Sequence, residues 1–162
     1  MVGRLSVVGS RRLADSHLGK TLQGRSYRDL EVWQKAMDLV VSCYSATRKF
    51  PDREAFGLMS QMQRAAISTP ANMAEGQGRQ HRSEFIQFLC IANGSLTELE
   101  THVQIARRLN YIGDEEERQL LAQTGEVGRL LNGLLCYLRR KGSPTAPGQT
   151  GNRQPRTDNS CV

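Results

Sequence analysis

One stretch of the chain, residues 85–106, repeats apolar side chains with the period of a helix in a bundle. The repeat advances by four and three residues in turn through Phe85, Leu89, Ala92, Leu96, Leu99, Val103 and Ala106. Such a stripe lies along one face of an α-helix and has to be covered by other helices. Phe88 and Ile91 widen the stripe, which predicts burial on two sides. Gly94 lies mid-helix, where glycine costs about 1 kcal/mol relative to alanine, so we expect another helix to approach closely there.

Three further stripes predict three more helices. The first stripe is Leu30, Trp33, Met37, Val40 and Tyr44. The second is Met59, Met62, Ala66, Pro70 and Met73, and the last is Leu120, Val127, Leu131, Leu134 and Leu138. The four helices are expected to begin at the polar N-caps Asp29, Asp52, Ser83 and Asp114. Because the connections are short, the predicted fold is all-α, an antiparallel up-down-up-down four-helix bundle.

The net charge of +6 is concentrated outside the predicted bundle. Residues 1–26 carry +4 and residues 142–162 carry +1, whereas residues 27–141 carry +1 from 15 basic and 14 acidic side chains. We therefore divide the chain into a flexible basic leader (1–26), the four-helix bundle (27–141) and a tail (142–162). The tail is rich in Pro, Gly, Ser, Thr and Asn and has few apolar side chains to offset the entropy of ordering, so we predict that it is disordered.

Residue patterns that would indicate enzyme chemistry are missing from the sequence. His17, His81 and His102 have no second ligand at a metal-binding spacing on the same helix face. No nucleophile elbow or similar catalytic motif is found. We therefore expect no catalytic residues, no metal and no cofactor, and a protein that is not an enzyme.

The four cysteines do not resemble a disulfide framework. Cys43, Cys90 and Cys136 fall in predicted helices and Cys161 falls in the tail, with no CxxC pair and no secretory apolar region. We predict reduced, buried thiols in the helices. No run of about 18 apolar residues is present, so we predict no membrane span and a cytoplasmic protein.

The stretch 58–82, LMSQMQRAAISTPANMAEGQGRQHR, has an unusual combination of features. Pro70 lies inside the helical pattern and predicts a kink, and small side chains surround it. A polar motif of Asn72, Glu75 and Gly76 follows. The stretch resembles the signature of the 23S rRNA-intervening sequence protein family, a four-helix bundle family that typically reads QLRRAAVSIPSNIAEG. Thr69 departs from that pattern, because it places a hydroxyl where the family has isoleucine.

Three other stretches strengthen this resemblance: YRDLEVWQKAMDL (27–39), FPDREAFGLMSQ (50–61) and IANGSLTELETHVQIARRLNYI (91–112). The resemblance implies a homopentameric ring. It also implies kinship with the accessory variability determinant proteins of diversity-generating retroelements, which partner a reverse transcriptase and bind nucleic acid. Family members usually begin just before the motif at Tyr27, so the leader is either a flexible basic arm or an upstream extension that is not translated.

Two functions follow as hypotheses. In the first, the protein is a non-enzymatic oligomer that binds RNA or a nucleoprotein, with Arg79, Arg82, Arg107 and Arg108 as candidate contacts. In the second, it is a structural or regulatory module that binds a protein partner and no nucleic acid. The polar side chains of the 58–82 stretch have two interpretations: a hydrogen-bond network that fixes the kink, or, for Glu75 with Arg79 and Arg82, a partner-facing end of the bundle.

Overall fold

The computed structural model describes residues 26–140, which fold into four long helices and two short 3-10 helices. The long helices are α2 (Glu31–Thr47), α3 (Leu58–Gln77), α4 (Arg82–Arg108) and α5 (Asp114–Arg140). The short ones are η1 (Tyr27–Asp29) and η2 (Asp52–Glu54). No strand occurs between residues 26 and 140. The predicted all-α four-helix bundle is confirmed, while the predicted tail and the leader up to Arg25 lie outside the described residues.

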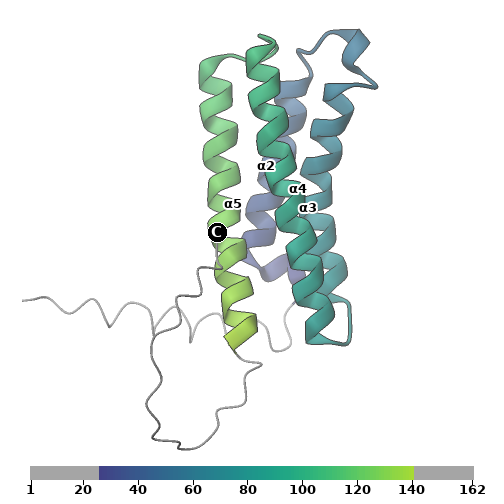
Figure 1. The fold of residues 1–162 in the computed structure, drawn as a ribbon, viewed down its shortest axis with the longest axis vertical. Coiled ribbons are helices and arrows are strands. Elements are labelled where there is room, and N and C mark those ends of the chain that lie inside the picture. Colours follow the sequence, from purple (N-terminus) through teal and green to yellow (C-terminus); the bar gives the residue numbers. More distant parts are fainter. Residues whose placement is uncertain (1–25, 141–162) are drawn as a thin grey trace, which may run out of the picture.

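Successive helices run in alternating directions, so the bundle is antiparallel (Figure 1). Each helix packs against two neighbours, in the cyclic order α2, α3, α4, α5. The closest pairing is that of α3 with α4. The α2–α3 and α4–α5 connections lie at one end of the bundle (Figure 1). The α3–α4 link lies at the other end, together with the beginning of α2 and the end of α5 (Figure 1).

Helix α4 carries the stripe that the sequence predicted. All seven positions of its repeat are buried: Phe85, Leu89, Ala92, Leu96, Leu99, Val103 and Ala106. The expected widening of the stripe is confirmed only in part: Phe88 is half-buried next to Gly76 of α3, whereas Ile91 remains 47% exposed. Gly94 is also not a contact point: a methyl group on it would meet nothing within 4 Å. Helix α4 therefore buries one broad face, and its outer face is open.

Helix α2 is rotated relative to its predicted orientation. Apart from Leu30, the side chains that enter the core are one position away from the predicted stripe: Val32, Ala36, Leu39, Cys43 and Ala46. Both sets have the same helical spacing, so spacing alone could not separate them. The observed set has the smaller side chains, while Trp33 and Val40 of the predicted stripe are partly buried and pack against the core. Met37, Val41 and Tyr44 are left 39%, 68% and 40% exposed on the outer face of α2.

Three of the four predicted N-caps do not begin the long helices. Asp29 instead closes a capping box with Ser26 around η1, and Asp52 begins η2. The backbone N–H of Leu58 donates to Glu54, so a glutamate side chain caps α3. Helix α4 begins at Arg82, one residue before Ser83, and no side chain caps it. Asp114 is the first residue of α5, and the preceding N–H, that of Gly113, donates to Glu116.

Helix α3 continues through Pro70 to Gln77. Thr69 is fully buried, and its hydroxyl donates to the carbonyl oxygen of Ala65 at 3.2 Å. The hydroxyl at this position is therefore accommodated without an unpaired donor. Within residues 26–140, no helix has the length and apolar character needed to cross a membrane.

Candidate functional site

Hydrogen bonds along the α3–α4 seam account for Asn72. Its side-chain amide donates to the carbonyl oxygen of Ser68 at 2.8 Å and to the hydroxyl of Ser68 at 2.9 Å. That hydroxyl lies 2.9 Å from the hydroxyl of Ser95 on α4, which also donates to the carbonyl of Ile91. Asn72 is therefore part of a network that ties α3 to α4, and it has a structural role next to Pro70.

Gly76 is a point of close approach between α3 and α4. A Cβ atom on this glycine would lie 2.6 Å from Cβ of Phe88 and 3.0 Å from Cδ2 of Phe85. Real Cβ atoms do not approach so closely, so only glycine fits without a shift of one helix. Gly76 consequently fixes how the end of α3 meets the first turns of α4.

Arg79 lies just beyond α3 and is held by two side chains. Its guanidinium pairs with the carboxylate of Glu75, one helical turn earlier. Its Cζ atom lies 5.0 Å from the centroid of the Phe88 ring, within the range of a cation–π contact. Arg79 remains 46% exposed. Glu75 thus neutralises much of its charge, while the remaining N–H groups stay available to a partner.

Arg82, the first residue of α4, is the most unusual of the candidates. Its Nε and Nη2 atoms are sealed from water and have no hydrogen-bond partner among the described residues. The side chain lines a cavity of about 240 Å³ at the end of the bundle. The other residues around this cavity come from the end of α3, the link, α4 and α5: Gln77, Arg79, Gln80, His81, Phe85 and Leu138.

Arg107 and Arg108 lie at the other end of α4. With a rise of 1.5 Å per residue, about 37 Å of helix separates Arg82 from Arg107. Arg107 donates to Asp114 through Nε at 2.5 Å and lies 3.8 Å from Glu117, so it joins the α4–α5 corner. Arg108 is exposed. The four predicted arginines therefore form two separate pairs within one chain, and Arg107 is already engaged.

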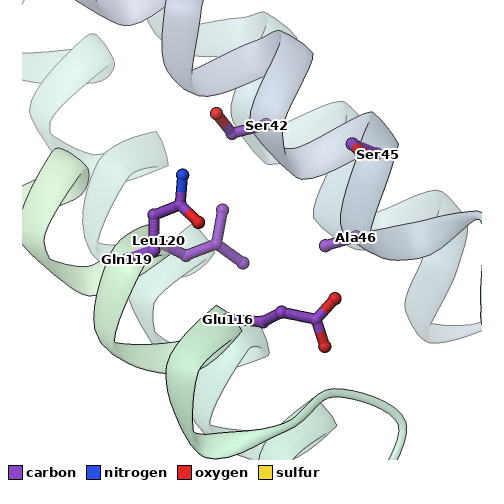
Figure 2. Close-up of a pocket in the computed structure, with 6 residues that line it drawn as sticks. All are labelled: Ser42, Ser45, Ala46, Glu116, Gln119 and Leu120. Carbon is purple, nitrogen blue, oxygen red and sulfur yellow. The ribbon is translucent and has the colours of Figure 1, made fainter.

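A second, smaller cavity of about 130 Å³ lies between α2 and α5. Figure 2 shows Glu116, Gln119 and Leu120 of α5 on one side and Ser42, Ser45 and Ala46 of α2 on the other. The N–H of Gly113 and the ammonium of Lys49, at 2.5 Å, hold the pKa of Glu116 below its ordinary value. A carboxylate that is kept ionised and paired is a weak general base. The groove therefore offers polar contacts, with no activated nucleophile.

The described part of the chain contains no group of three or more His, Cys, Asp or Glu side chains placed to hold a metal ion. The thiols differ from one another. Cys43 is fully buried, and burial raises its pKa to about 12. Cys136 is half-buried, but Cys90 is exposed, with Nη2 of Arg139 3.6 Å from its sulfur. The prediction of buried thiols is thus wrong for Cys90, because its position faces outward beside the buried Leu89.

Sequence reasoning missed two features of these surfaces. It could not find the cavity beside Arg82, because Leu138, which lines it from α5, lies more than 50 residues further along the chain. It also placed Met37 and Tyr44 in the core, when they are exposed. The apolar outer face of α2 could have been noticed from the competing stripe through Ala36 and Cys43.

The fold and its surfaces define an antiparallel four-helix bundle with a tight, glycine-dependent α3–α4 seam. Residues 28–133 match the model of the 23S rRNA-intervening sequence protein family, and the chain belongs to this family. Among solved structures, it is similar to a protein of unknown function from the S23 ribosomal protein family of Bacteroides thetaiotaomicron, with 25% identity and a TM-score of 0.60. That similarity covers 64% of this chain and 97% of the other. No curated protein matches the chain.

Proposed function

We propose that this protein is a non-enzymatic cytoplasmic oligomer that binds RNA, or a nucleoprotein partner such as a reverse transcriptase, through the α3–α4 end of the bundle. One observation carries this proposal: basic side chains gather at the end of the bundle from which the basic leader also extends. Arg79 and Arg82 lie there, and Arg139 and Arg140 close α5 at the same end (Figure 1).

The covalent attachment of residues 1–25 adds to the positive charge available at this end. They contain five basic residues and one acidic residue, and they join the bundle at Ser26. Residues 26–140 contain 14 basic and 14 acidic side chains. Because phosphate neutralisation supplies much of the affinity for nucleic acid, a neutral bundle needs either a local cluster or the leader. The α3–α4 end has both.

The salt dependence of RNA binding tests this proposal. Each phosphate neutralised on a single strand contributes a slope of about −0.7 in log affinity against log salt. Fluorescence anisotropy with a single-stranded RNA should therefore give a slope that flattens by about three units when residues 1–25 are deleted. Ser26 is kept because it caps η1. Absence of binding at about 50 mM salt, where electrostatic binding is favoured, would refute the nucleic-acid proposal.

The proposal includes self-assembly, for which the resemblance implies a pentamer. The exposed apolar side chains on α2 support it, because Met37, Val41 and Tyr44 recur on one face of the helix. Light scattering should give a mass of several times the 18.1 kDa chain, five times for a pentamer. The double substitution of Met37→Glu and Val41→Glu should reduce the measured mass to that of a single chain. Thr97→Glu, on the exposed face of α4, should leave the mass unchanged. A monomeric wild-type protein at micromolar concentration would contradict self-assembly.

The same apolar face favours a second candidate function, a structural or regulatory module that binds a protein partner and no nucleic acid. Phe56, which is 97% exposed in the turn after η2, adds to the apolar surface available to a partner. This candidate is preferred if the protein binds no RNA at low salt. Gene neighbours discriminate independently, since a reverse transcriptase gene with template repeats, or an rRNA insertion, favours the first function.

A further inference from the structure

The packing of the bundle does not account for the cavity beside Arg82. It lies where the end of α3, the link to α4 and the last turns of α5 meet. With a volume of about 240 Å³, it exceeds the space that one water molecule occupies several-fold. Its apolar wall is formed by Phe85 and Leu138, which are 8% and 7% exposed. Its polar wall is formed mainly by arginine, glutamine and histidine.

In this wall, the guanidinium of Arg82 is the charged group whose loss of hydration is not offset by a hydrogen-bond partner or an ion pair. A charged group that is removed from water is costly unless it is paired. Two of its nitrogens are sealed from water without a partner among the described residues. Glu75, the nearest acidic residue before the link, is already engaged by Arg79. An anion in the cavity would therefore lie next to a cation that has lost part of its hydration.

Helix dipoles do not by themselves favour an anion here. The positive end of α4 faces this region, but α3 and α5 direct their negative C-terminal ends towards it (Figure 1). The side chains have to supply the positive potential. Arg79 retains N–H donors that Glu75 does not use, and Arg82 adds a delocalised positive charge whose Nη1 group is not among the sealed atoms. The neutral amides of Gln77 and Gln80 line the remaining polar wall.

We propose that this cavity binds a single phosphate group, with Arg82 as its principal contact and Arg79 as the second. The inference rests on the proposed RNA-binding function, and it assigns to this cavity one phosphodiester of the bound RNA. The bases would lie outside, because Phe85 and Leu138 are packed into the end of the core and leave no room for stacking between them.

The first arm of the test uses inorganic phosphate and the full-length, ¹⁵N-labelled protein. At constant ionic strength, phosphate should shift the backbone amides of residues 79–85 and the Nε–H signal of Arg82 in a saturable way, and chloride should not. Arg82→Gln should weaken this binding at least about tenfold, as expected for loss of a charge-assisted contact. Arg82→Lys should retain part of it. Arg129→Gln, an exposed arginine on α5, is the matched control and should bind like the wild type.

The second arm uses a single-stranded RNA of about twelve nucleotides, where each lost phosphate contact reduces the salt slope by about 0.7. Arg82→Gln should reduce the slope by that amount, and inorganic phosphate should compete with the RNA for the protein.

If RNA binds but Arg82→Gln changes neither phosphate binding nor the salt slope, the phosphate site is refuted while RNA binding stands. If phosphate binds at residues 79–85 but RNA does not bind, the site takes free phosphate and the RNA function fails. If neither phosphate nor RNA binds, both the phosphate site and the RNA-binding function are refuted. Circular dichroism melting verifies that each variant is folded.

Discussion

Gly76 lies directly against Phe88, so that a methyl group on the glycine would come within 2.6 Å of the phenylalanine Cβ atom. The contact joins the last turn of α3 to the second turn of α4. Phe88 also contacts Arg79, whose Cζ atom lies 5.0 Å from the centroid of the ring. The glycine therefore packs against a residue that belongs to both the seam and the basic end.

Gly76→Ala should destabilise the bundle by about 1–3 kcal/mol, the usual cost of overpacking a tight site. Urea unfolding followed by circular dichroism measures this change. Gly94→Ala is the matched control on the open face of α4, where the added methyl group meets nothing within 4 Å. It should stabilise the protein by up to about 1 kcal/mol through helix propensity. Equal effects of the two substitutions would contradict the proposed role of Gly76.

The Glu116 carboxylate should make part of the stability pH-dependent. Its pKa is lowered in the folded protein by the N–H of Gly113 and by Lys49. A lowered folded-state pKa contributes stability that is present above the unfolded value, about 4.3 for glutamate, and that is lost as the pH falls through the folded value. The thermal midpoint of Glu116→Gln should therefore lie below that of the wild type at neutral pH. The difference between the two thermal midpoints should disappear in acid. A difference that does not change with pH would contradict a stabilising role for the ionised Glu116 carboxylate.

Cysteine labelling should distinguish the thiols by burial. At pH 8 a thiol with a pKa of about 12 is ionised in only about one molecule in ten thousand. Cys43 should therefore resist iodoacetamide in the native protein and react once urea unfolds it. Cys90 is exposed and should react in both states. Peptide mass spectrometry reads the two sites separately, and rapid native labelling of Cys43 would show that α2 opens locally.

A fragment of residues 26–141 should fold by itself, because all four long helices and the Ser26 cap lie within it. Its helical circular dichroism signal and cooperative thermal transition should match those of the full chain. An unfolded fragment alongside a helical full-length protein would show that residues 1–25 or 142–162 stabilise the bundle.

The sequence predicted the number and order of the long helices because each carries a strong apolar repeat. It predicted the main stripe of α4 correctly, since Leu89, Leu96 and Val103 belong to one unbroken repeat. It was wrong for part of α2, where Met37 and Tyr44 are exposed while Ala36 and Cys43 are buried. Helical spacing alone does not reveal which of two overlapping apolar stripes faces the core.

The candidate site was predictable only in part. Arg79 and Arg82 were identified as members of a basic link, and they lie together at one end of the bundle. Their separation from Arg107 follows from the length of α4, which the sequence already implied. The engagement of Arg107 by Asp114 and the loss of hydration at Arg82 depend on side-chain packing between helices. A linear motif contains no record of such packing.

The position of both chain ends has a consequence for affinity. Residues 1–25 and 141–162 are attached at the end of the bundle that holds the arginine-lined cavity (Figure 1). A leader of 25 residues reaches at most about 85 Å when fully extended, so in the proposed function an RNA strand held by its basic residues would stay tethered within that distance of Ser26. A second contact at Arg82 would then be intramolecular, and the effective local concentration, in place of the bulk concentration, would govern it. Two weak phosphate contacts can in this way act as one avid site.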